Sequence, residues 1–130
     1  MSEVRFLTIE AVLDLHRMQI DRFGGDVGLR DLGLVESAMA QPCQSFGGEY
    51  LHKDLPEMAA AYLYHLCCNH AFIDGNKRVA TITAVTFLGS NGFRLDVDQD
   101  ILLRLVRGVA LGEIDKDEVI VFFRTNVKAI

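Results

Sequence analysis

Apolar residues recur every three or four positions along most of this chain, the spacing that collects them on one face of an α-helix. The first such stretch begins after Thr8, carries His16 on its apolar face and stops at Gly24. A second, shorter helix is predicted from the capping residue Asp31 to about Met39. The first third of the chain is therefore predicted to form two helices.

The middle of the chain carries two further helical patterns. Asp54 and Glu57 have the spacing of a capping box with a proline in the first turn, and the apolar residues that follow cover nearly every face. A helix of this kind belongs at the centre of a molecule. The next helix is predicted from about Asn76 to Ser90, with Gly92 as its left-handed stop.

The last third of the chain predicts two more helices. Asp98 can cap the first, which runs through Ala110, and Asp115 with Glu118 forms a second capping box. The apolar run after Glu118 also suits a strand. The capping box in front of it favours a helix.

Residues 43–51 differ from the helical pattern. They are aromatic and polar around Gly47 and Gly48, which favours a small hairpin or flap. No internal repeat is visible in the 130 residues, a length typical of one domain that buries roughly two thirds of the surface of its unfolded chain. We therefore predict a single domain, residues 1–130, built as an all-α bundle with one small β flap.

The charge balance excludes several classes of function. The 13 basic and 18 acidic side chains give a net charge of −5, without the basic excess that binding to nucleic acid or to a membrane surface requires. The uncharged stretch from Val79 to Phe93 is too short and too polar to span a membrane. The first residues do not resemble a signal peptide, so we expect a cytoplasmic protein.

The chain has three cysteines, Cys43, Cys67 and Cys68, an odd number that suits reduced thiols better than a disulfide framework. His65 lies three residues from Cys68, and His70 three residues from Cys67, a spacing compatible with zinc ligands on one helix face. The surrounding run is apolar, and buried cysteine is a common small hydrophobe. A packing role is therefore favoured over zinc.

The chemically unusual segment is residues 70–78, between the two most apolar helices. Only four charged side chains occur from residue 55 to residue 93, and three of them, Asp74, Lys77 and Arg78, fall in this segment. Charged groups beside an apolar core are costly unless they pair with each other or with a ligand. The cluster therefore indicates a binding or catalytic site.

The residue types in this segment fit phosphate chemistry. Gly75 and Asn76 favour a turn that directs backbone N–H groups and the positive end of the next helix at one point, a cradle for an anion. Lys77 and Arg78 have the wrong sign for the start of a helix. A bound polyphosphate would supply the missing negative charge.

Two more side chains complete the predicted phosphate-transfer site. Asp74 offers a hard oxygen ligand for Mg²⁺, and His70 can accept a proton near neutral pH. Each has an ordinary alternative when taken singly, since His70 can end a helix and Asp74 can cap one. Phe72 between them is assigned to the core as an anchor of the loop. The conjunction of these residues favours the site.

The segment from His70 to Arg78 resembles the Fic signature, H-x-F-x-(D/E)-G-N-x-R, and agrees with it at every fixed position. The chain looks more particularly like the death-on-curing (Doc) branch of the Fic/Doc family. This resemblance covers most of the chain, and outside the signature it rests on three short stretches, Arg22-Phe23-Gly24-Gly25, Asn91-Gly92 and Gly112-Glu113-Ile114.

Two positions depart from the pattern of Fic proteins that transfer AMP. Lys77 stands where a glycine is usual, and Thr81 stands where a second arginine is expected. Doc-like proteins share both departures. The resemblance therefore implies that ATP binds in the reverse sense and that its γ-phosphate passes to a threonine of elongation factor Tu, which stops translation. The implied cofactors are ATP and Mg²⁺.

The resemblance also implies a role for each position of the site. His70 would be the base that takes a proton from the target hydroxyl, and Asp74 would hold Mg²⁺. Gly75 and Asn76 would bind phosphate through backbone and amide groups. The two basic residues that follow them would neutralise the transferred and bridging phosphates.

Partners follow from the same resemblance. The flap, residues 45–51, would bind the target segment as an added strand. The inhibitory pattern of self-silenced Fic proteins, (S/T)-x-x-x-E-(G/N), is not accepted here, because Ser45 and Glu49 are followed by Tyr50. A toxin without an internal inhibitor needs an external one. The expected partner is a Phd-type antitoxin whose tail folds onto the toxin as a helix.

Three other functions stay open. The chain could be a Fic-type AMP or nucleotidyl transferase, or a catalytically silent Fic-like binding module. The retained His70 and Asp74 argue against silence. A metal-dependent hydrolase built on the same two residues is disfavoured, because Gly75 breaks the helix that would hold them in register.

Overall fold

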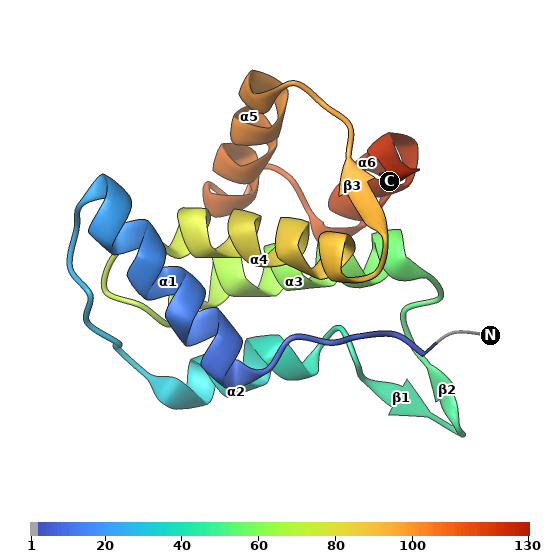
Figure 1. The fold of residues 1–130 in the computed structure, drawn as a ribbon, viewed down its shortest axis with the longest axis horizontal. Coiled ribbons are helices and arrows are strands. Elements are labelled where there is room, and N and C mark those ends of the chain that lie inside the picture. The colour runs from blue at the N-terminus through green and yellow to red at the C-terminus, as the bar shows by residue number, and fades with distance from the viewer. Residues whose placement is uncertain (1–2) are drawn as a thin grey trace.

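The computed structural model describes residues 3–130 as six helices and two small sheets (Figure 1). The helices are α1 (Ile9–Phe23), α2 (Leu32–Ala40), α3 (Leu55–Asn69), α4 (Asn76–Ser90), α5 (Gln99–Ala110) and α6 (Lys116–Asn126). The strands are β1 (Ser45–Phe46), β2 (Glu49–Tyr50), β3 (Phe93–Leu95) and β4 (Val127–Ala129). The predicted helical bundle is confirmed. None of the helices within residues 3–130 has the length and apolar character to cross a bilayer.

Helix α3 lies in the middle of the bundle, which confirms the central position predicted from its apolar surface. It packs against α2, α4, α5 and α6, while α1 packs against α4 (Figure 1). Asp54 caps α3 by accepting a hydrogen bond from the N–H of Glu57 at 3.0 Å. The reciprocal half of the predicted capping box is wrong, because the Glu57 carboxylate instead accepts from the N–H of Lys53 at 2.9 Å.

Three fully buried aromatic side chains, Tyr62, Phe87 and Phe123, join α3, α4 and α6 in the core. The rings of Tyr62 and Phe87 lie 4.9 Å apart. The Tyr62 hydroxyl accepts a hydrogen bond from the N–H of Leu7 at 3.1 Å, which fixes the segment in front of α1 to the core. Burial is the main reason that the pKa of Tyr62 rises to about 12, so this hydroxyl stays protonated.

The predicted flap is confirmed as the antiparallel pair β1 and β2, with Ser45 opposite Tyr50. It projects away from the helices (Figure 1), and the Phe46 side chain is 82% exposed. The sequence predicts one β element, and this is wrong, because β3 and β4 form a second antiparallel pair. Strands of three residues carry little local signal. Their pairing arises because α6 brings the end of the chain beside β3.

The starts of α5 and α6 differ in their capping. Asp115 accepts from the N–H of Glu118 at 2.9 Å, and the Glu118 carboxylate accepts from the N–H of Asp115 at 3.1 Å. The predicted capping box of α6 is therefore confirmed. Asp98 occupies the capping position of α5, but its side chain makes no capping hydrogen bond.

Candidate active site

The predicted site residues lie on the connection between α3 and α4 and on the first turn of α4. Helix α3 ends at Asn69, and His70 after it adopts the left-handed conformation with φ 50° and ψ 45°. Gly75, just before α4, is also left-handed with φ 77° and ψ 19°. These two residues reverse the chain at one end of the bundle, beside the end of α1 (Figure 1).

His70 is held in an unusual backbone conformation. Within residues 3–130 it is the one residue other than glycine with a positive φ. This conformation costs roughly 1–3 kcal/mol for a residue with a Cβ, and such residues cluster at functional sites. The exposed His70 side chain lines a cavity of about 380 Å³ together with Asp74, Gly75 and Lys77.

The start of α4 has the geometry of an anion site. No side chain caps this helix. Its first backbone hydrogen bond is the one from the N–H of Val79 to the carbonyl of Gly75, at 2.9 Å. The N–H groups that precede Val79 have no acceptor within the helix, and they add to the positive end of its dipole. An anion in the cavity could accept hydrogen bonds from these N–H groups and would be stabilised by the helix dipole.

The Asn76 side chain is occupied with the loop itself. Its Oδ1 accepts from the N–H of Phe72 at 3.1 Å, and its Nδ2 donates to the carbonyl of Phe72 at 2.9 Å. In this structure the Asn76 amide therefore fixes the loop. The backbone N–H groups of residues 76–78 are the part of the cradle that is free for an anion.

Asp74 is the acidic residue of the loop and lies close to Arg78 of α4. Its Oδ1 accepts from the N–H of Gly75 at 2.8 Å and lies 3.8 Å from Nη2 of Arg78. Half of the Asp74 side chain, 51%, is exposed. No group of three potential metal ligands occurs among the described residues, so Asp74 offers a cation a single carboxylate. Such a carboxylate suits Mg²⁺ that also binds phosphates.

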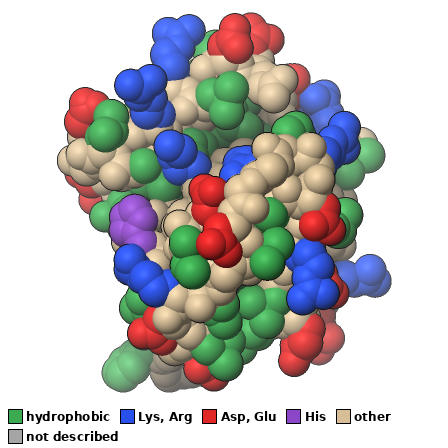
Figure 2. All heavy atoms as spheres, turned by 90° about the vertical axis from the view of Figure 1, so that its left-hand side faces the viewer, with side chains coloured by type: hydrophobic (Ala, Val, Ile, Leu, Met, Phe, Trp, Pro, Cys, Tyr) green, Lys and Arg blue, Asp and Glu red, His purple; other side chains and the backbone are tan. Residues whose placement is uncertain are grey.

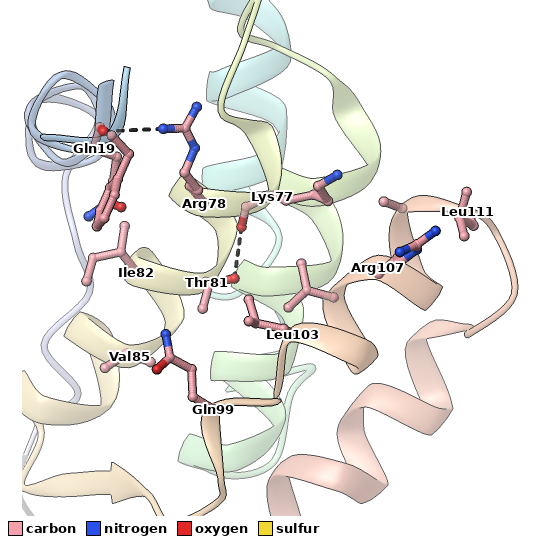
Figure 3. Close-up of a pocket in the computed structure, with 13 residues that line it drawn as sticks. Gln19, Lys77, Arg78, Thr81, Ile82, Val85, Gln99, Leu103, Arg107 and Leu111 are labelled. Atoms are coloured by element: carbon pink, nitrogen blue, oxygen red, sulfur yellow. Dashed lines mark hydrogen bonds between the residues drawn. The ribbon is translucent and has the colours of Figure 1, made fainter. Parts of the chain in front are cut away.

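The two basic residues point in different directions (Figure 3). Nη1 of Arg78 donates to the carbonyl of Gly24 at 3.0 Å and to that of Gln19 at 3.4 Å, so the guanidinium is anchored on the end of α1. Lys77 is exposed and points away from α1, on the side of Arg107 in α5. Arg78 is therefore preorganised, whereas Lys77 is free to follow a ligand.

The structure adds His16 of α1 to the site. This histidine is buried, with 2% of its surface exposed, and its ring stacks on that of Phe72 at a centroid distance of 3.8 Å. Its Nε2 lies 2.7 Å from the carbonyl oxygen of Asp74. In the sequence, the only signal for this contact is a histidine on an otherwise apolar helix face. The assignment of Phe72 as an anchor of the loop is confirmed by its 3% exposure.

The segment between α1 and α2 supports the loop from another side. Leu29 and Phe72 form an isolated antiparallel bridge. The carbonyl of Ala71 accepts from the N–H of Arg30 at 2.9 Å and from that of Asp31 at 3.1 Å. Contacts from α1 and from this segment therefore hold residues 71–74 in place.

A larger groove of about 630 Å³ (Figure 3) adjoins the cavity that His70 lines, and Lys77 and Arg78 line both. Apolar side chains of α4 and α5, among them Ile82, Val85 and Leu103, form its walls. Figure 2 shows this end of the molecule, where basic and acidic side chains and a histidine surround a recess. The site therefore combines a charged cavity with an apolar neighbour.

The packing role predicted for the cysteines is confirmed for Cys67, which is fully buried, whereas Cys43 and Cys68 are exposed. Burial is the main reason that the pKa of Cys67, which lines the same cavity as His70, rises to about 11, so its thiol is neutral. Burial likewise lowers the pKa of His65 to about 4. No three potential metal ligands cluster within residues 3–130.

Comparison with known proteins agrees with this geometry. The model of the Fic/DOC family matches residues 6–88, which include the whole loop and the first turn of α4. A protein named Toxin Doc from Mycolicibacterium smegmatis is 41% identical over 99 residues, covering 75% of this chain and 76% of that protein. The Protein kinase doc of Escherichia phage P1 is 34% identical over 116 residues, covering 89% of this chain and 90% of that protein.

Proposed function

Because this chain belongs to the Fic/DOC family, we propose that it is a toxin that acts as a protein kinase. It transfers the γ-phosphate of ATP to a threonine or serine hydroxyl of a translation factor such as elongation factor Tu, and so inhibits translation. The names of the two relatives, Toxin Doc and Protein kinase doc, support this class of activity. The observation that carries the choice of phosphate transfer is the exposed Lys77 at the start of α4.

His70 is the base of the proposed reaction. It takes the proton from the target hydroxyl, whose oxygen forms a bond to the γ-phosphorus. The bond between that phosphorus and the oxygen bridging it to the β-phosphate breaks, and ADP leaves. The exposed position of His70 on the wall of the cavity supports this role, because a protein segment can reach it there.

The terminal phosphates bind at the start of α4. The N–H groups of its first turn donate to phosphate oxygens, and Lys77 and Arg78 offset the charge that develops during transfer. Asp74 is the residue that would hold Mg²⁺. When bound there, the cation would supply further charge neutralisation. The single carboxylate suits a cation that arrives with the nucleotide.

Lys77 favours the orientation that places the γ-phosphate at the loop. A nucleotide with its α-phosphate over the cradle needs close backbone approach at position 77, which glycine allows. The lysine side chain obstructs that approach. With the nucleotide reversed, the same side chain, exposed on the α5 side of the cavity (Figure 3), stabilises the group being transferred.

Labelled ATP tests the proposal. The protein is incubated with elongation factor Tu or a cell extract and with ATP labelled on either the γ- or the α-phosphate. We expect only the γ-label to appear in the target, and Lys77→Met, which keeps the chain length without the charge, to slow transfer about 10²-fold. Transfer of the α-label would replace the kinase with an AMP transferase. Transfer of neither label would favour a silent binding module.

The partner of this toxin is a Phd-type antitoxin, whose tail folds as a helix in the groove between α4 and α5. Its apolar walls and the cations Lys77, Arg78 and Arg107 around it suit an amphipathic helix with acidic residues. Co-expression of the antitoxin encoded beside the toxin tests this. Leu103→Asp in the groove is expected to prevent rescue of growth without loss of toxicity, whereas Ile101→Asp, outside the groove on α5, is expected to be rescued.

A further inference from the structure

His16 is a polar side chain on a buried face. It lies one helical turn from Val12 and one from Ile20, and all three are buried. A buried polar group needs a hydrogen-bond partner, and His16 finds it 58 residues away in the carbonyl of Asp74. Because a carbonyl oxygen only accepts, Nε2 of His16 must carry the hydrogen of this 2.7 Å bond. The proposed reaction assigns no role to this contact.

The hydrogen bond fixes the peptide that joins Asp74 to Gly75. The carbonyl of Asp74 and the N–H of Gly75 belong to one planar unit and point in opposite directions. With the carbonyl directed at His16, the N–H of Gly75 is directed away from α1, where it donates to Oδ1 of Asp74 at 2.8 Å. The loop therefore presents an N–H group, and not a carbonyl oxygen, on the side of the Asp74 carboxylate.

Apart from these two hydrogen bonds the peptide can rotate, because Gly75 tolerates both signs of φ. Its present φ is 77°. The loop also lies close against α1, since a Cβ added at Gly75 would stand 3.1 Å from Cδ1 of Ile20 and 3.5 Å from Nε2 of His16. The stack of His16 on Phe72, with planes 16° apart, keeps the imidazole in position for the hydrogen bond.

We propose that His16 is a positioning residue of the phosphate site, which acts through the backbone of Asp74 to keep the peptide between Asp74 and Gly75 in the orientation that receives an anion. This inference rests on the proposed function, because the anion is taken to be the terminal phosphate of ATP. A rotated peptide would direct a carbonyl oxygen at that phosphate and repel it.

Three variants separate this role from simple packing. His16→Phe keeps an aromatic ring on Phe72 but loses the N–H donor, and His16→Gln carries an amide donor of similar reach. Val12→Ala is the control, because Val12 is fully buried one turn away on the same helix and removing its methyl groups weakens packing without touching the hydrogen bond.

The first measurement is kinetic, with γ-labelled ATP and elongation factor Tu at a temperature where each variant is folded. We expect His16→Phe to lower kcat about 10²-fold with the KM for the target protein unchanged, since a displacement of about 1 Å near the reacting groups has this effect. The kcat of His16→Gln is expected to be at least tenfold higher than that of His16→Phe. Val12→Ala is expected to keep the kcat of the original chain. Unchanged kcat in His16→Phe would overturn the proposal.

The second measurement does not depend on transfer. Hydrogen exchange of the Gly75 amide in the ligand-free protein is expected to be at least tenfold faster in His16→Phe than in the original chain and in Val12→Ala. Equal exchange rates would contradict the role of His16.

If the original chain transfers neither label, the proposed function fails and the exchange measurement alone tests the role of His16. If His16→Phe does not fold, His16→Gln decides, because a hundredfold loss of kcat or faster exchange despite its donor would refute the proposal.

Discussion

His70 has a backbone that is strained and a side chain that is exposed on the cavity. These two properties have separate consequences. The left-handed conformation would be relieved by glycine, whereas the proposed chemistry needs the imidazole. The other residues of the loop are held by hydrogen bonds, with Asn76 and His16 each bound to loop backbone. At the scale of residues, the site is a short loop whose shape is fixed by polar contacts.

The first prediction compares His70→Ala with His70→Gly. Both variants lack the proposed base, so transfer is expected to fall 10²–10⁴-fold in each. Glycine tolerates φ 50° and alanine does not, so His70→Gly is expected to be the more stable by about 1 kcal/mol. Growth arrest on expression and urea unfolding measure the two effects. A stable His70→Ala protein that is still fully toxic would rule out the mechanism.

The second prediction concerns Asp74→Asn. The amide keeps the shape and an oxygen that accepts from the N–H of Gly75, but it loses the charge that would attract Mg²⁺. Titration calorimetry should show weaker binding of ATP with Mg²⁺ present and little change without it. Asp14→Asn, at an exposed position of α1, is the control and should bind like the original chain. Equal binding by both variants in both conditions would reduce Asp74 to a structural role.

At the scale of elements, the helices differ in how their ends are stabilised. The start of α4 has no side-chain cap and is open for a ligand, whereas α3 and α6 are capped by Asp54 and Asp115. An uncapped first turn is less stable on its own. In α4 the neighbouring α1 and α3 hold the helix in place by packing.

The third prediction uses this difference between caps. Asp115→Ala removes the acceptor of the Glu118 N–H and is expected to lower the free energy of unfolding by about 1 kcal/mol. Asp98→Ala, at the same position of α5, removes no side-chain capping bond and should cost only a few tenths of that. Urea unfolding of the two variants checks the contrast. Equal losses would mean that the capping hydrogen bond contributes nothing at Asp115.

At the scale of the whole molecule, two histidines, His52 and His65, lie away from the proposed active site. Burial lowers the pKa of His65 to about 4, with Lys116 and His52 adding to the effect, and the pKa of His52 is also lowered mainly by burial. Nδ1 of His52 and Nε2 of His65 are buried without a hydrogen-bond partner among the described residues. Both histidines are therefore neutral in the folded protein at neutral pH.

The fourth prediction is a loss of stability in mild acid. Because the pKa of His65 is lower in the folded than in the unfolded chain, the unfolded chain binds more protons between pH 6.5 and about 4. The stability due to neutral His65 is present above pH 6.5 and is lost as the pH falls towards 4. From about pH 7.5 to about pH 5 the loss is about 2 kcal/mol. Urea unfolding should show a smaller pH dependence in His65→Leu, and an identical one would contradict the assignment.

The sequence by itself determined the helices and the chemistry of the loop. Caps such as Thr8 and Asp115, and stops such as Gly92, act within a few residues, so a local pattern is enough to place them. The signature from His70 to Arg78 is likewise contiguous, because one turn presents all of its groups. These features needed no knowledge of distant contacts.

Only the tertiary structure decided how that loop is held. The contacts of His16 with Asp74 and of Arg78 with Gly24 join residues 58 and 54 positions apart, and the pairing of β3 with β4 joins Phe93 to Ala129. No local pattern specifies such partners, because they meet only after the helices, α6 included, have packed through apolar faces that carry no information about polar contacts. Packing of the core therefore sets the geometry in which the residues of the signature can act.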